Sequence, residues 1–179
     1  MDTNLDPKRT EPLLELRGIS KRFTGVLALD RVDLDVRAGE LHVLFGENGA
    51  GKSTLINVIA GTFPPNEGTF RFGGEEIRHL TPQQARAIGI SPVFQEFSLV
   101  PSLTVEENLF LGREISSKGV LRAGEMRKRA KALIDELGFD LDPSQRADDL
   151  SRAHQQMAEI AKALLGRARL LSLDERPPR

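Results

Sequence analysis

Residues 46–54 have the residue types and the spacing of a phosphate-binding loop. They read GENGAGKST, match the pattern G-x-x-x-x-G-K-[ST], and stand between an apolar run and a predicted helix. Glycines let consecutive backbone N–H groups close on a polyphosphate, and a helix N-terminus adds its positive dipole end. The lysine supplies a mobile charge and the serine hydroxyl a Mg²⁺ ligand. The residues expected to bind a Mg-nucleotide are Gly46, Asn48, Gly49, Gly51, Lys52, Ser53 and Thr54.

Alternating apolar runs and helix-end residues surround this loop. Alternation predicts short strands at 13–16, 29–36, 41–45 and 69–72, and the apolar run 170–173 predicts a buried strand. Helices are predicted over 55–60, 81–89, 104–112, 125–137 and 152–165, of which the third opens with the capping box Thr104-x-x-Glu107. This order of elements predicts an α/β protein with a helical insertion.

Composition excludes several classes of function. The 179 residues include 25 basic and 26 acidic ones, so the net charge of −1 argues against a nucleic-acid-binding surface. No cysteine is present, which excludes disulfides and thiolate chemistry. No apolar run reaches the roughly 18 residues of a membrane span. Residues 1–12 are polar with two prolines and are expected to form a disordered tail.

Further motifs narrow the class of phosphate-loop protein. Lys21-Arg-Phe23, GENGAGKST, Gln95 and the stretch LSRAHQQMAEIAKALLGRARLLSLDE at 150–175 closely resemble the ATP-binding subunits of ABC transporters. The segments GVLALDRVDL, VFQEFSLVPSLTVEENLFLGRE and QQMAEIAKALL are similar to the sugar-importer branch of ribose, xylose and galactose type. The resemblance covers about residues 13–175.

The resemblance implies a fold and a set of partners. The fold is a P-loop ATPase of ABC type: a parallel-sheet core, an N-terminal antiparallel β-subdomain and an α-helical subdomain at about 96–150, within an incomplete nucleotide-binding domain at 13–179. Two such domains would sandwich two ATPs with Mg²⁺ and drive transmembrane permease subunits at the inner face of the cell membrane. A periplasmic sugar-binding protein would take part indirectly.

The resemblance also assigns roles to single residues. Phe23 matches the aromatic residue that stacks on adenine. Gln95 matches the glutamine that contacts Mg²⁺ and the attacking water. Asp174 matches the carboxylate that holds Mg²⁺ through water, and Glu175 the catalytic carboxylate that polarises the attacking water. Ser53 completes the expected Mg²⁺ ligands.

The chain departs from the family at 150–154. An LSGGQ-type sequence should stand there, but the segment reads Leu-Ser-Arg-Ala-His. In the family this segment contacts the ATP of the other domain, so Ser151, Ala153 and His154 are expected to act across the dimer. The methyl group of Ala153 and the bulk beside it hinder close backbone approach, so impaired hydrolysis is expected.

A second departure is the ending Arg-Pro-Pro-Arg at 176–179. The family continues with Pro-Thr-Ala-Ala, and deletion of one base from suitable codons yields this ending, so we expect a truncated or frameshifted form. In the family a later strand lies between the strands expected at 41–45 and 170–173. Without it their backbone groups lack partners, and marginal stability is expected.

These observations leave three hypotheses about the function. The leading one is an ATP-hydrolysing subunit of a sugar-type ABC importer. The first alternative is a nucleotide-binding remnant without turnover. The second alternative is an unrelated P-loop enzyme such as a kinase, against which Gln95 and the helix expected at 152–165 argue.

Overall fold

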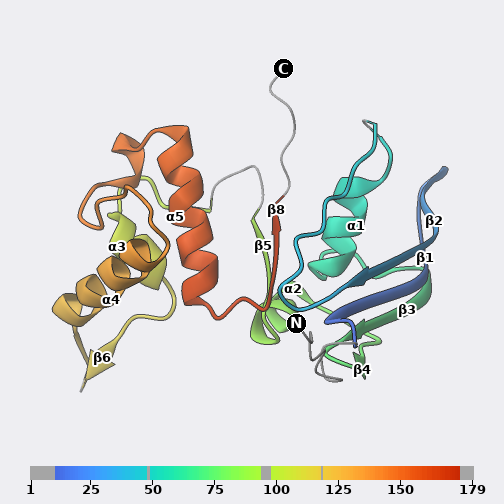
Figure 1. Cartoon of the computed structure of the whole chain (residues 1–179), viewed down its shortest axis with the longest axis horizontal. Helices are drawn as coiled ribbons and strands as arrows, with labels where there is room; N and C mark the ends of the chain where they lie inside the picture. Colours follow the sequence, from blue (N-terminus) through green and yellow to red (C-terminus); the bar gives the residue numbers. More distant parts are fainter. Residues whose placement is uncertain (1–10, 48, 94–97, 118, 174–179) are drawn as a thin grey trace, which may run out of the picture. The chain divides into compact units, whose positions relative to one another are not determined.

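The structure is a computed structural model that describes residues 11–47, 49–93, 98–117 and 119–173. The chain divides into two compact units, Met1–Ser91 and Pro92–Arg179 (Figure 1). Residues 1–10 of the expected tail lie outside the described ranges.

An antiparallel sheet forms most of the first unit. Its strands are β1 (Leu14–Phe23), β2 (Val26–Val36), β3 (Glu67–Phe72) and β4 (Glu75–Glu76), in the order β2-β1-β3-β4. Leu16 of β1 faces Leu34 of β2 and Phe70 of β3. Because β1 lies between two strands, its apolar side chains Leu14, Leu16 and Ile19 are almost fully buried. The strands expected near 13–16, 29–36 and 69–72 are confirmed.

The hairpin of β1 and β2 ends in a tight turn at Thr24-Gly25. Phe23 is paired with Val26 directly beside this turn, whereas the register between the two strands shifts three times between Leu16 and Arg22. Gly25 has φ +78°, a conformation that costs glycine little and other residues more. Phe23 therefore stands at the tip of the hairpin.

Two helices complete the first unit. Helix α1 (Lys52–Ile59) buries Leu55, Ile56, Val58 and Ile59. Helix α2 (Pro82–Ala87) begins at Thr81, whose side chain accepts from Gln84 N at 3.3 Å while Gln84 Oε1 accepts from Thr81 N at 2.9 Å. The helices expected at 55–60 and 81–89 are thus confirmed, the first beginning three residues earlier.

The prediction of a strand at 41–45 is wrong. Residues 41–47 form no strand, and Leu41, Val43 and Phe45 are 91 %, 72 % and 100 % exposed. The alternation of apolar residues is present, but a strand also needs a hydrogen-bonded neighbour. Among the described residues no strand is paired with this segment.

The second unit is built on three helices around one apolar cluster. The helices are α3 (Val105–Phe110), α4 (Ala123–Glu136) and α5 (Arg152–Leu165). Their buried side chains recur at helical spacing, as the sequence predicts for α4. The cluster consists of Val105, Leu109, Phe110, Met126, Ala130, Ile134, Leu141, Leu150, Ala158 and Ala161.

Short elements accompany these helices. Strands β6 (Ser116–Ser117) and β7 (Val120–Leu121) form a small hairpin, and Ala147–Asp149 forms a 3-10 turn, η2. Strand β8 (Leu170–Leu173) pairs with β5 (Ile90–Val93), which crosses the boundary between the units. A strand forms at 170–173 as expected, but its expected burial is wrong: residues 170–172 are half-buried and Leu173 is 46 % exposed.

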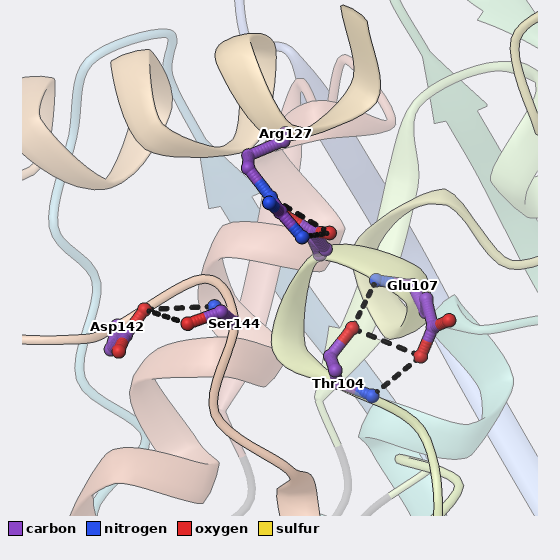
Figure 2. A network of polar contacts seen from close by, with 6 residues as sticks. Thr104, Glu107, Arg127, Asp142 and Ser144 are labelled. Carbon is purple, nitrogen blue, oxygen red and sulfur yellow. Dashed lines mark hydrogen bonds and ion pairs between the residues drawn. The ribbon is translucent and has the colours of Figure 1, made fainter. Parts of the chain in front are cut away.

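Polar contacts fix the ends of the helices (Figure 2). The expected capping box opens α3: Thr104 Oγ1 accepts from Glu107 N at 3.3 Å, and Glu107 Oε2 accepts from Thr104 N at 2.8 Å. The Thr104 N–H holds the pKa of the Glu107 carboxyl below its usual value. Arg127 on α4 forms a two-bond ion pair with Glu106 on α3, with N–O distances of 2.8 and 2.9 Å.

Asn108 is the buried polar centre of α3. Its side chain is fully buried, and its Oδ1 accepts from Val100 N at 2.7 Å. Its Nδ2 donates to the carbonyls of Val100, Leu103 and Thr104 at 3.0 to 3.2 Å. One amide thereby holds the whole turn that precedes α3.

We predict that Asn108→Ala lowers the free energy of unfolding of the second unit by about 2–4 kcal/mol, because it leaves several buried backbone groups unpaired. Thr104→Ala in the same helix removes one cap and is expected to cost about 1 kcal/mol. Urea unfolding followed by circular dichroism at 222 nm measures both. Equal costs for the two variants would contradict the role given to Asn108.

Candidate functional site

The loop that precedes α1 adopts a glycine-dependent conformation. Gly49 has φ +88° and Gly51 has φ +84°, both in the left-handed region. Residues with a Cβ atom rarely adopt this conformation, so the two glycines let the loop turn back on itself before the helix. Asn48, directly before Gly49, lies outside the described residues.

Gly51 is also the point where the loop touches the sheet. A Cβ atom on this residue would lie 2.5 Å from the carbonyl oxygen of Ala28 and 2.9 Å from Cδ2 of Leu29. Both neighbours belong to β2, and the nearer one is backbone that cannot swing aside. Glycine at this position therefore permits the close packing of the loop against the hairpin strand.

The N-terminus of α1 suits an anion. Gly51 is the residue that precedes the helix, it supplies no side-chain cap, and the first turn contains no acidic residue. The first backbone N–H groups of a helix have no acceptor inside the helix, and they lie at its positive end. Ser53 and Thr54 belong to this first turn.

Lys52 folds back over its own loop. Its Nζ donates to the carbonyl oxygens of Gly46 at 2.5 Å and Glu47 at 2.8 Å. These two bonds hold the ammonium group at the mouth of the loop. The structure thus brings together Gly46, Gly49, Gly51, Lys52, Ser53 and Thr54, as the sequence predicts, and their role in binding stays a prediction.

Phe23 lies at the hairpin tip and is 38 % exposed. Its ring meets that of Phe63 edge to face, with centroids 5.3 Å apart and an angle of 82°. Lys21 Nζ lies 5.3 Å from the centroid of the Phe23 ring. Sequence reasoning selected Phe23 and missed Phe63, because no spacing rule connects residues forty positions apart.

The expected glutamine and carboxylates lie outside the described residues: Gln95, Asp174 and Glu175. The strands that lead to them are present, since β5 ends two residues before Gln95 and β8 ends directly before Asp174. Within β8 the hydroxyl of Ser172 is buried and has no hydrogen-bond partner among the described residues.

A second cluster missed from the sequence joins α5 to Ser98. The buried Glu159 carboxylate accepts hydrogen bonds from the Ser98 N–H and, at 3.0 Å, from Ser98 Oγ. Lys162 Nζ donates to Ser98 O at 3.3 Å. The pKa of Lys162 lies below its usual value, chiefly because burial disfavours the charged form. The nearby Glu159 carboxylate partly offsets this shift, and the positive charge of Arg113 adds to it. This cluster fixes the chain just after the segment that contains Gln95.

Helix α5 begins at the segment that departs from the family pattern. Ser151 caps the helix, and its Oγ accepts from His154 N at 3.3 Å. Ala153 in the first turn of α5 is exposed and is not among the side chains of the apolar cluster. The action of Ser151, Ala153 and His154 across a dimer stays a prediction.

Two further findings concern metals and membranes. Within the described ranges no group of three or more His, Asp or Glu side chains is placed to hold a metal ion. The helices described there are also too short or too polar to cross a bilayer. Ser53 alone among the expected Mg²⁺ ligands is described, and its hydroxyl oxygen is a donor of the type Mg²⁺ accepts.

Comparison with known proteins points to one family. Residues 29–177 match the family model described as ABC transporter. The chain is 51 % identical over 164 residues to the ribose import ATP-binding protein RbsA 1 of Rubrobacter xylanophilus. It is also 51 % identical over 163 residues to a putative ribose/galactose/methyl galactoside import ATP-binding protein of Rhizobium meliloti. These alignments cover 92 % and 91 % of this chain but 33 % and 32 % of the relatives, so the chain spans about a third of their length.

Solved structures agree with this result. The ADP conformation of MJ1267, an ATP-binding cassette of an ABC transporter, superposes with a TM-score of 0.78 at 30 % identity, covering 90 % of this chain and 68 % of that one. The dimeric bacterial ABC transporter cassette MJ0796 gives a TM-score of 0.74 at 29 % identity, covering 90 % and 73 %. The expected α/β fold of a P-loop ATPase of ABC type is confirmed.

We predict that Gly51→Ala destabilises the chain more than Gly49→Ala. Both positions have positive φ, so each alanine pays a conformational cost of about 1–2 kcal/mol. Only at Gly51 would the new methyl group also meet the Ala28 carbonyl. Thermal unfolding of both variants measures the difference, and equal falls in the midpoint would show that the close approach at Gly51 is unimportant.

Proposed function

Because the chain belongs to the ABC transporter ATPase family, we propose that it binds Mg-ATP at residues 46–54 as the ATP-binding part of a sugar importer. The observation that carries this proposal is the phosphate loop itself. Two left-handed glycines lead into a helix that has no acidic first turn, and Lys52 stands at the mouth of the loop. Membership of the family removes the P-loop kinase as an alternative.

In this proposal each part of the loop has one task. The backbone N–H groups at the start of α1 receive phosphate oxygens, and Lys52 exchanges its carbonyl partners for the β- and γ-phosphates. Ser53 offers its hydroxyl to Mg²⁺, which would neutralise phosphate charge. Asp174 and Gln95 are proposed as the other contributors to the metal, and Glu175 as the residue that orients water.

The proposed partners follow from the names of the relatives. Ribose and ribose/galactose import ATP-binding proteins are among the relatives described above, and a dimeric cassette is among the solved neighbours. We therefore propose a second nucleotide-binding domain, transmembrane permease subunits and, indirectly, a periplasmic sugar-binding protein. The chain would work at the cytoplasmic face of the membrane without spanning it.

We further propose that this chain hydrolyses ATP more slowly than its relatives. The family glycines that would approach the partner's ATP are replaced by Arg152 and Ala153, and both side chains are exposed at the start of α5. An exposed methyl group and guanidinium there keep the backbone N–H groups away from a second nucleotide. A nucleotide-binding remnant without turnover is the alternative, and measured turnover separates the two.

We predict that Lys52→Ala lowers the affinity of the full chain for Mg-ATP by at least about tenfold, because it removes one charge-assisted contact to phosphate. Lys128→Ala, an exposed lysine on α4, is the matched control and should leave the affinity unchanged. Isothermal titration calorimetry measures both. Unchanged binding in Lys52→Ala would place the nucleotide elsewhere.

We predict that phosphate release from Mg-ATP is at least about 10²-fold slower than for the ribose-import relatives, by analogy with other lost charge-stabilising donors. A phosphate-release assay on the full chain, with Lys52→Ala as the blank, measures it. Release above the blank but slow supports impaired hydrolysis, and release equal to the blank supports the remnant. Release at the rate of the relatives would overturn both.

A further inference from the structure

Two aromatic rings and a lysine meet outside the phosphate loop. They are Phe23, Phe63 and Lys21, called here the aromatic cluster. The two rings meet edge to face at 5.3 Å, a favourable arrangement for aromatic pairs. Lys21 Nζ lies 5.3 Å from the centroid of one ring and 5.9 Å from the other, within the range of cation–π attraction. The cluster thus combines stacking area with a fixed positive charge.

Hydrogen bonds fix the cluster from the side of Phe63. Lys21 Nζ donates to Pro64 O at 2.7 Å, so the ammonium group ties β1 to the loop that carries Phe63. In the same loop Asn66 Oδ1 accepts from Arg22 N at 2.7 Å, and Asn66 N donates to Ser20 O at 2.8 Å. The ring of Phe63 is therefore held against Phe23 by backbone contacts as well as by ring contact.

The cluster lies close to the phosphate loop along two routes. Phe23 is paired with Val26, and two residues further along β2 the carbonyl of Ala28 meets Gly51. Two residues of strand span about 7 Å. Helix α1 starts at the loop, and its Asn57 carbonyl accepts from Thr62 N at 2.9 Å, one residue before Phe63. Both rings are thus connected to the loop through short, hydrogen-bonded pieces of chain.

We propose that Lys21 and Phe63 are positioning residues that hold the Phe23 ring ready to stack on the base of a purine nucleotide whose phosphates occupy residues 46–54. The proposal rests on the proposed function of the phosphate loop. Phe23 is 38 % exposed, so part of its ring remains open to a ligand after Phe63 has covered its share. A ring already held in one orientation loses less rotamer freedom when a base stacks on it.

The contact between the rings of Phe23 and Phe63 sets how much the affinity for the nucleotide should fall when Phe63 is replaced. An edge-to-face aromatic contact changes an equilibrium constant by a factor of about 2 to 10. Phe63→Leu keeps an apolar side chain in place but removes the ring. It should therefore weaken binding of the base by that factor and leave binding of the phosphates unaffected.

The experiment compares two ligands that share their phosphates and differ in the base: Mg-ATP and Mg-tripolyphosphate. Calorimetry on the full chain gives the affinity of each for the unsubstituted protein, Phe63→Leu and Lys21→Met. The control is Val26→Ala, which shortens a 60 % exposed side chain at the same hairpin tip. We expect Phe63→Leu to weaken Mg-ATP about 2- to 10-fold, Lys21→Met to act in the same direction, and tripolyphosphate and the control to change by less than about 2-fold.

The following results would overturn the proposal. Unchanged Mg-ATP affinity in both variants would show that the cluster takes no part in base binding. Equal losses for Mg-ATP and tripolyphosphate would show that the cluster only supports the fold. If Phe63→Leu fails to fold by circular dichroism, Lys21→Met decides, because it keeps both rings. Failure of the unsubstituted chain to bind tripolyphosphate would instead overturn the proposed function of the loop, and the base platform with it.

Discussion

The close approach of Gly51 to the carbonyl of Ala28 is the constraint on which the candidate site depends. It brings the phosphate loop against β2 at a distance that only glycine allows. The same residue, with φ +84°, turns the chain into α1 and leaves the first N–H groups of that helix without side-chain caps. Because β2 continues to the hairpin tip, this one contact also fixes how far Phe23 stands from the loop.

Sequence patterns predicted most elements that have strong local rules. The capping box at Thr104 and Glu107, the helical stripe of α4 and the loop glycines all act through neighbours in the chain, so their spacing is visible in one dimension. The segment 41–45 has the alternation of a strand and yet forms none. Strand formation depends on a partner elsewhere in the chain, and alternation carries no information about that partner.

The contacts that the sequence does not predict are long-range and made by ordinary residues. Phe63 meets Phe23 across forty positions, and Glu159 holds Ser98 across about sixty. A phenylalanine or a glutamate of this kind has no spacing signature, so only the folded chain shows these contacts. Gln95, Asp174 and Glu175 rest on resemblance alone, because they lie outside the described residues.

The central claim is that a nucleotide's phosphates bind the backbone of the loop and of the first turn of α1. A titration of the ¹⁵N-labelled full chain with Mg-ATP, followed by amide NMR, tests this most directly. We expect the largest chemical-shift changes at the amides of residues 49–54, with smaller changes at the amides of Phe23 and Phe63. Shifts confined to other parts of the chain, with the amides of 49–54 unmoved at saturation, would contradict it.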